Sequence, residues 1–192
     1  MTREATIDAI QAEADTRRWL ERAVIGLNLC PFAKAVHVKA HIHYAVYMPA
    51  DEASLIDALL AEAHGLAALD ASVRDTTLLI APNTLADFLD FNDFTARAER
   101  KLVRAGFDGV FQLASFHPQF QFAGTENGDI TNATNRAPYP TLHLLREASV
   151  SRAVEAFPEA EAIFERNIET LEALGPDGWA ALDVGPGSAR SS

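Results

Sequence analysis

Strand-like and helix-like patterns alternate through the middle of the chain, and this alternation restricts the fold more than any other feature. Strands are predicted at 41–48, where apolar and polar residues alternate, at 76–81 and at 109–116. Helical patterns fill the two intervals, and a glycine marks the end of each. Strand–helix–strand connections of this kind are right-handed and favour parallel pairing. We therefore expect an α/β fold with a mostly parallel sheet of three to four strands and helices packed on it.

A long amphipathic helix is predicted over residues 4–29, where apolar residues recur with helical spacing. Pro31 would end this helix, because proline lacks an amide proton and clashes with the preceding turn. Proline also favours the first position of a helix, so a second, short helix is expected to begin at Pro31. Cys30 would then be the N-cap of that short helix.

Two more helices are predicted near the C-terminal end, at roughly 141–156 and 158–174. A glycine–proline pair ends the second helical pattern, and small polar residues dominate the last part of the chain. We therefore expect a single α/β domain over residues 1–175 and a flexible tail over residues 176–192.

Residues 117–140 follow the third strand and show no sustained strand or helix periodicity. A loop of this length is uncommon in a compact domain and is usually either functional or disordered. Large apolar side chains, which are scarce in disordered segments, favour an ordered loop: Phe116, Phe120, Phe122, Ile130 and Tyr139. We expect the loop to pack over the carboxyl ends of the strands near Cys30, where α/β sheets bind their ligands.

The composition disfavours several classes of function. A formal net charge of −11 argues against nucleic-acid binding, which needs a basic surface. No apolar run approaches the roughly 20 residues that cross a bilayer, and the first residues do not have the pattern of a signal peptide. With a single cysteine, Cys30, the chain has no internal disulfide. We expect a cytoplasmic protein that binds neither nucleic acid nor membrane.

Four segments of the chain, at 27–34, 87–93, 114–125 and 135–147, resemble a bacterial family, domain-of-unknown-function family 1415. The resemblance covers most of the chain and implies a single-domain soluble protein, but it implies no activity. Ala137 stands where the motif Asn-Arg-Ser-Pro-Tyr-Pro would have serine, so a hydroxyl at that position is not expected to have a role here.

Cys30 is a candidate nucleophile. At the N-terminus of a short helix, with Lys34 one turn further on, its thiol would have a lowered pKa. The same position follows the C-terminus of the first helix, whose partial charge acts in the opposite direction. A free cysteine is also often buried as a small apolar residue. Both interpretations stay open at this point.

His117 and His143 are candidates for proton transfer. His117 ends a strand inside the long loop, where it could act as a general base or anchor the loop backbone. His143 and Glu147 would share one face of the helix expected at 141–156. Near the start of that helix they could bind an anion or a metal, although a solvated charged stripe is the commoner outcome for such a pair.

Arginines in and after the loop favour an anionic ligand. A guanidinium binds carboxylates and phosphates through paired donors, so Arg136 and Arg146 are predicted to bind substrate, together with Asn135 and Tyr139. The alternative for Arg136 is a salt bridge to an acidic residue of the same loop.

Three functions are compatible with these residues. The first is an enzyme that acts on a small anionic metabolite at a site formed by the Cys30 turn and residues 117–147, with Cys30, His117 and His143 as catalytic residues. The second is a zinc-like metal-binding protein, whose candidate ligands are Cys30, His117, His143 and Glu147. The third is a non-catalytic binding or assembly module. The sequence identifies no cofactor, reaction type or oligomeric state.

Overall fold

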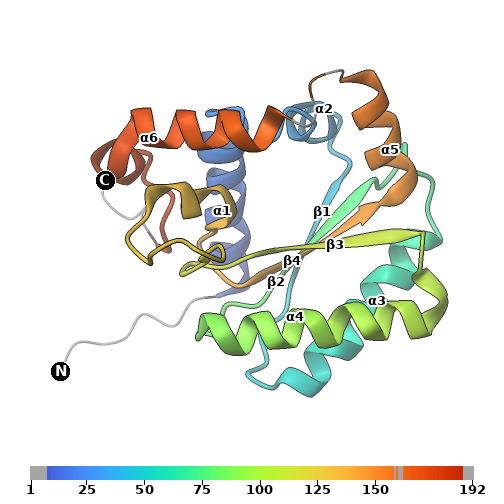
Figure 1. Cartoon of the computed structure of the whole chain (residues 1–192). Coiled ribbons are helices and arrows are strands. Elements are labelled where there is room, and N and C mark those ends of the chain that lie inside the picture. Colours follow the sequence, from blue (N-terminus) through green and yellow to red (C-terminus); the bar gives the residue numbers. More distant parts are fainter. Residues whose placement is uncertain (1–7, 158, 160–161, 188–192) are drawn as a thin grey trace.

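A computed structural model of the chain describes residues 8–157, 159 and 162–187. Figure 1 shows one central sheet that has helices on both of its faces, so the predicted α/β class is confirmed. The sheet has the strand order β1-β2-β4-β3 and consists of β1 (Ile42–Val46), β2 (Thr76–Ile80), β3 (Phe111–Phe116) and β4 (Thr141–Arg146).

The sheet is mixed, which corrects the prediction of a mostly parallel sheet. β1 pairs with β2 in parallel, but β4 lies between β2 and β3 and is antiparallel to both. The error arose at residues 141–146, which were expected to begin a helix and instead form a strand. Leu142 and Leu144 lie on one face of the sheet, and His143 and Leu145 line a cavity on the other, as a period of two requires.

Helix α5 (Glu147–Ala156) begins only where β4 ends. His143 and Glu147 therefore belong to different elements. The prediction that they share one face of a helix over residues 141–156 is wrong. Glu147 instead accepts a hydrogen bond from Gln112, at 3.0 Å from its Nε2.

One face of the sheet is covered by α3 (Glu52–Ala67) and α4 (Phe88–Leu102). Their apolar side chains, among them Leu59 and Phe94, pack on Leu142 and Leu144 of β4. Helix α4 begins later than the proline at residue 82 suggested, because Asp87 is its N-cap and accepts hydrogen bonds from the first-turn amides.

The other face carries α1 (Ala9–Trp19), its continuation η1 (Leu20–Ile25) and α2 (Ala33–Val38). Of the helix predicted over residues 4–29, residues 9–25 are helical, and the first part lies outside the described residues. Helix α2 begins at Ala33 rather than Pro31, and its N-cap is Phe32, so Cys30 does not cap it. Among the described residues, no helix combines the length and the apolar character needed to cross a membrane.

Helix α6 (Ile163–Ala181) continues beyond the glycine–proline pair that was expected to end it. Gly175 adopts a φ of 67°, which favours glycine, and Pro176 starts a further helical stretch after this kink. The region expected to form a flexible tail thus includes the end of α6. Residues 188–192 lie outside the described part of the chain.

The loop over residues 117–140 lies where it was predicted. The His117 amide donates to Asn135 O and the Ala81 amide donates to Pro140 O, which places both ends of the loop at the edge where β2 and β3 end. Inside the loop, the buried Asn132 side chain accepts from the Phe122 amide and the Thr125 hydroxyl and donates to a backbone carbonyl. Its short helix η3 (Ile130–Asn135) packs against α6.

A buried carboxylate, Asp15, ties α1 to two distant segments. It accepts hydrogen bonds from Tyr139 Oη at 2.6 Å, the Gly187 amide at 2.8 Å, Arg18 Nη2 at 2.7 Å and Gln11 Nε2 at 2.8 Å. Burial acts to raise the pKa of Asp15, but these hydrogen bonds, led by that of Tyr139, outweigh burial and lower it. The Asp15 carboxylate is therefore ionised, and its four hydrogen-bond donors together stabilise the charged form.

Substitution of this carboxylate should destabilise the fold strongly. We expect Asp15→Ala to lower the free energy of unfolding by about 3–5 kcal/mol, because it removes the buried carboxylate that pairs with Arg18 and leaves the Tyr139 hydroxyl without its acceptor. Tyr139→Phe, which removes one donor, should cost about 1–3 kcal/mol. Urea denaturation followed by tryptophan fluorescence would measure both.

The control is Glu13→Ala, which breaks an exposed ion pair with Arg17 on the same helix and should cost about 0–1 kcal/mol. Equal stabilities of the Asp15 and Glu13 variants would contradict a central role for Asp15.

Candidate functional site

An apolar cavity of about 280 Å³ lies between the sheet and the segment that runs from α1 to α2. All four strands contribute to it, through Ile42, Thr76, Leu78, Ala114, Phe116, His143 and Leu145. The opposite wall consists of Trp19, Leu20, Val24, Cys30, Phe32, Ala33 and Val36. None of these described lining residues carries a carboxylate, an ammonium or a guanidinium. We call this space the Cys30–His143 cavity.

His143 lines the cavity, and a hydrogen bond to Thr76 holds its ring. Thr76 Oγ1 lies 2.6 Å from His143 Nε2 and 2.6 Å from the backbone oxygen of Leu144. Burial lowers the pKa of His143 to about 4, because its surroundings solvate an imidazolium poorly. The ring is therefore neutral at physiological pH.

Cys30 lines the same cavity, so the structure brings together two of the three predicted catalytic residues. Burial raises the pKa of the Cys30 thiol, and the opposing effect of the Phe32 and Ala33 amides is smaller. This direction is the reverse of the one expected for a helix N-cap beside Lys34, whose side chain is exposed. Within the described part of the chain, no hydrogen bond joins the Cys30 thiol to His143.

His117 lies outside the cavity and anchors the loop backbone. Its Nδ1 accepts from the Gln119 amide at 3.0 Å, and its Nε2 lies 3.0 Å from Leu85 O, so Nε2 carries the proton and donates. The ring is fully buried against Phe91 of α4, with ring centroids 5.0 Å apart. Burial lowers its pKa despite the hydrogen bond to Leu85. Both nitrogens serve the fold, as the anchoring alternative predicted.

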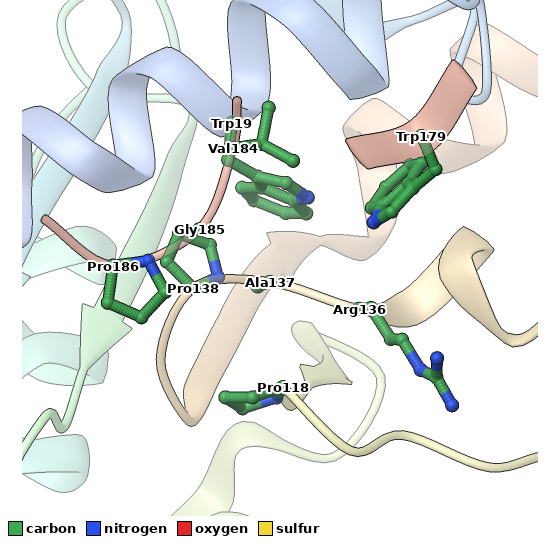
Figure 2. A pocket seen from close by; sticks show the side chains of 9 residues that line it. All are labelled: Trp19, Pro118, Arg136, Ala137, Pro138, Trp179, Val184, Gly185 and Pro186. Carbon is green, nitrogen blue, oxygen red and sulfur yellow. The ribbon is translucent and has the colours of Figure 1, made fainter. Parts of the chain in front are cut away.

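Arg136 supports the loop through backbone carbonyls. Its Nε donates to Phe120 O at 3.2 Å and its Nη2 to Asn127 O at 2.6 Å. Arg136 also lies at the edge of a second hollow, of about 200 Å³, between Trp19 and Trp179. Figure 2 shows that its guanidinium points away from these two indole rings. A ligand that lay between the two indole rings would therefore not contact the charge of Arg136.

The other predicted substrate-binding residues are also held within the fold. Arg146 Nη2 donates to the backbone oxygens of Leu66 and Leu69 at 2.6 and 2.7 Å, at the end of β4 opposite to the loop. Asn135 Nδ2 donates to Ser115 O at 3.2 Å, and Tyr139 donates to Asp15 as described above. The structure thus does not bring Arg136 and Arg146 together.

The four predicted metal ligands do not converge on one point. Cys30 and His143 line the cavity, His117 packs against α4, and Glu147 lies at the start of α5. Over residues 8–157, 159 and 162–187, no group of three or more His, Cys, Asp and Glu side chains is arranged to hold a metal ion.

Thr76 and Trp19 are cavity residues that the sequence reasoning did not single out. Thr76 is the first residue of β2 and pairs with Leu145 of β4. This pairing could have been recognised only if residues 141–146 had been identified as a strand. Trp19 belongs to the apolar stripe of the helix predicted over residues 4–29, and periodicity alone does not distinguish a core residue from a cavity wall.

The model of a family described as "Protein of unknown function (DUF1415)" matches residues 11–181, a range that includes both walls of the cavity. The resemblance found in the four sequence segments is thereby confirmed. Comparisons with curated proteins and with solved structures gave no match.

The raised pKa of Cys30 can be tested by alkylation. The rate of iodoacetamide labelling of the native protein should rise with pH to a midpoint above about 8.5, the value for a free thiol, because the thiolate is the reacting species. The same protein unfolded in urea is the matched control and should label faster at every pH below that midpoint. A native midpoint below the control midpoint would restore the reactive-thiolate interpretation.

Proposed function

The chain belongs to the family of proteins of unknown function (DUF1415), and we propose from its structure that it binds a small, uncharged, apolar molecule in the Cys30–His143 cavity. The observation that carries this proposal is the cavity itself. Its volume of about 280 Å³ is close to the lower limit of about 300 Å³ for pockets of drug-sized ligands. Its walls are apolar with few polar groups, which is typical of such pockets.

The apolar lining of the cavity supports a ligand with an apolar surface. Nine of the fourteen lining residues are only half-buried, so the cavity is partly open to solvent. Transfer of apolar surface from water to an apolar contact is favourable, and a ligand in the cavity would provide that contact. Leu20 and Val24 on one wall and Leu78 on the other would make such contacts with an apolar ligand.

The charges around the cavity favour a neutral ligand over the anionic metabolite that the sequence suggested. Arg136 and Arg146 already donate to backbone carbonyls, and none of the described lining residues is a lysine or an arginine. An anion would have to leave water for apolar walls without gaining a cationic partner, which is strongly unfavourable.

A thiol-dependent enzyme is the second candidate, because Cys30 and His143 line one cavity. Thiol catalysis needs a thiolate, which an adjacent base or positive charge provides. The pKa of Cys30 is raised and that of His143 is lowered, so both groups are neutral at physiological pH. These directions support binding over catalysis.

Binding can be tested by thermal unfolding in the presence of small neutral molecules, for example toluene, indole and 4-ethylphenol. A molecule that binds only the folded state should stabilise it by about 2.7 kcal/mol at one hundred times its dissociation constant. Ala33→Phe, which fills the cavity from α2, should remove most of this stabilisation.

The matched control is Ala35→Phe on the same helix, since Ala35 is exposed and does not line the cavity. This variant should respond to the ligands as the unmodified protein does. If none of the three molecules raises the unfolding temperature, or if both variants respond equally, the proposed function is wrong.

A further inference from the structure

Strand β3 forms one edge of the sheet, so alternate residues of β3 direct their backbone groups away from β4. The Glu147 amide donates to Val110 O at 3.0 Å, which identifies the even-numbered residues of this strand as those bonded to β4. The outward-facing residues are therefore Phe111, Leu113 and Ser115. Figure 1 shows β3 along this edge of the sheet, above α4.

The outward edge of β3 is covered at one end and open at the other. The loop covers the Ser115 position, because Asn135 Nδ2 donates to Ser115 O at 3.2 Å. In the described part of the chain, no hydrogen bond outside the β3–β4 ladder reaches the backbone of Phe111 or Leu113. The amide and carbonyl groups of these two residues are therefore able to pair with a further strand.

A groove of about 400 Å³ borders the open part of this edge. It lies between β3 and the end of α4, where the helix continues as η2 (Val103–Phe107). Val103 is 53% exposed, so part of the apolar lining is accessible to a partner. We call this space, together with the outward edge of Phe111 and Leu113, the β3 groove. Its apolar lining residues are Leu102, Val103, Phe107, Phe111 and Leu113.

Every charged residue that lines the β3 groove is acidic, namely Glu99, Asp108 and Glu147. The Glu147 carboxylate lies beside the strand, since its Oε2 is 3.0 Å from Gln112 Nε2. Within the described residues, none of the three acids forms an ion pair. The β3 groove therefore attracts a cationic partner and repels an anionic one.

We propose that the β3 groove binds an extended, basic segment of another protein, which adds a strand to β3. The backbone of this segment would pair with Phe111 and Leu113, and its lysine or arginine side chains would meet the three carboxylates. Its apolar side chains would cover Val103 and Leu113. The β3 groove shares no lining residue with the Cys30–His143 cavity, so this inference does not depend on the proposed function.

The charges favour a basic partner over a second copy of this chain. Pairing of β3 with β3 of another copy about a twofold axis would bring both sets of carboxylates to one interface. Like charges that face each other across paired strands are destabilising. Each copy also carries a formal net charge of −11, which adds to the repulsion. A segment with lysines or arginines replaces this repulsion by attraction.

Amide hydrogen exchange followed by NMR tests the inference, with the end-blocked peptide Lys-Val-Lys-Val-Lys as the probe. In the protein alone, the amides of Phe111 and Leu113 should exchange rapidly, because no acceptor holds them. At ten times the dissociation constant of the peptide, their exchange should slow by about tenfold, since it then proceeds only from the free fraction. The peptide Glu-Val-Glu-Val-Glu has the same backbone and valines and should not slow it.

A pair of variants tests the role of the carboxylates. Glu99→Lys should weaken binding of the basic peptide by about threefold to tenfold, because it replaces an attraction by a repulsion. Asp93→Lys is the matched control, since Asp93 is an exposed acid of α4 that does not line the groove. It makes the same change in net charge and should alter the dissociation constant by less than about twofold.

The inference would be overturned if up to about 1 mM basic peptide left the exchange of Phe111 and Leu113 unchanged, because the edge would then accept no strand. Equal slowing by the two peptides, or equal effects of the two variants, would show that the carboxylates do not select the partner. Slow exchange in the protein alone that becomes faster on dilution would show that a second copy occupies the edge instead.

Discussion

The buried carboxylate of Asp15 is the interaction on which the rest of the structure depends. It joins α1 to Tyr139 before β4 and to Gly187 near the end of the described chain. Because α1 is held there, Trp19, one turn further along the helix, packs against Phe116 of β3 with ring centroids 5.0 Å apart. Both aromatic side chains line the Cys30–His143 cavity, so the network that stabilises the fold also fixes the shape of the candidate site.

Strand β4 gives the sheet two different faces. Leu142 and Leu144 complete the core beneath α3 and α4, whereas His143 and Leu145 line the cavity. The sequence predicts β1 from its alternation of apolar and polar residues, and β2 and β3 from short apolar runs with clear boundaries. Residues 141–146 are ambiguous, since a short leucine-rich run fits strand and helix periodicity alike. Only pairing with two distant strands decides in favour of a strand, and local pattern does not contain that information.

The candidate site was predictable in part. Cys30 and His143 are reactive residue types in segments with a recognisable resemblance, and they do line one cavity. The roles of Arg136 and Arg146 were not predictable, because a guanidinium binds a carboxylate or a backbone carbonyl equally readily and the choice depends on distant segments. Arg146 binds carbonyls at the end of α3, far earlier in the chain. The cavity itself results from the spacing between α1, α2 and the sheet, which periodicity does not encode.

The central claim is that an apolar cavity lies between Cys30 and His143, and a crystal of the protein under xenon pressure tests it most directly. Apolar cavities bind xenon. We predict xenon density between the sheet and α2, in contact with Leu78 and Val36, and its loss in Ala33→Phe. Ordered water throughout this space, or xenon found only elsewhere in the protein, would contradict the claim.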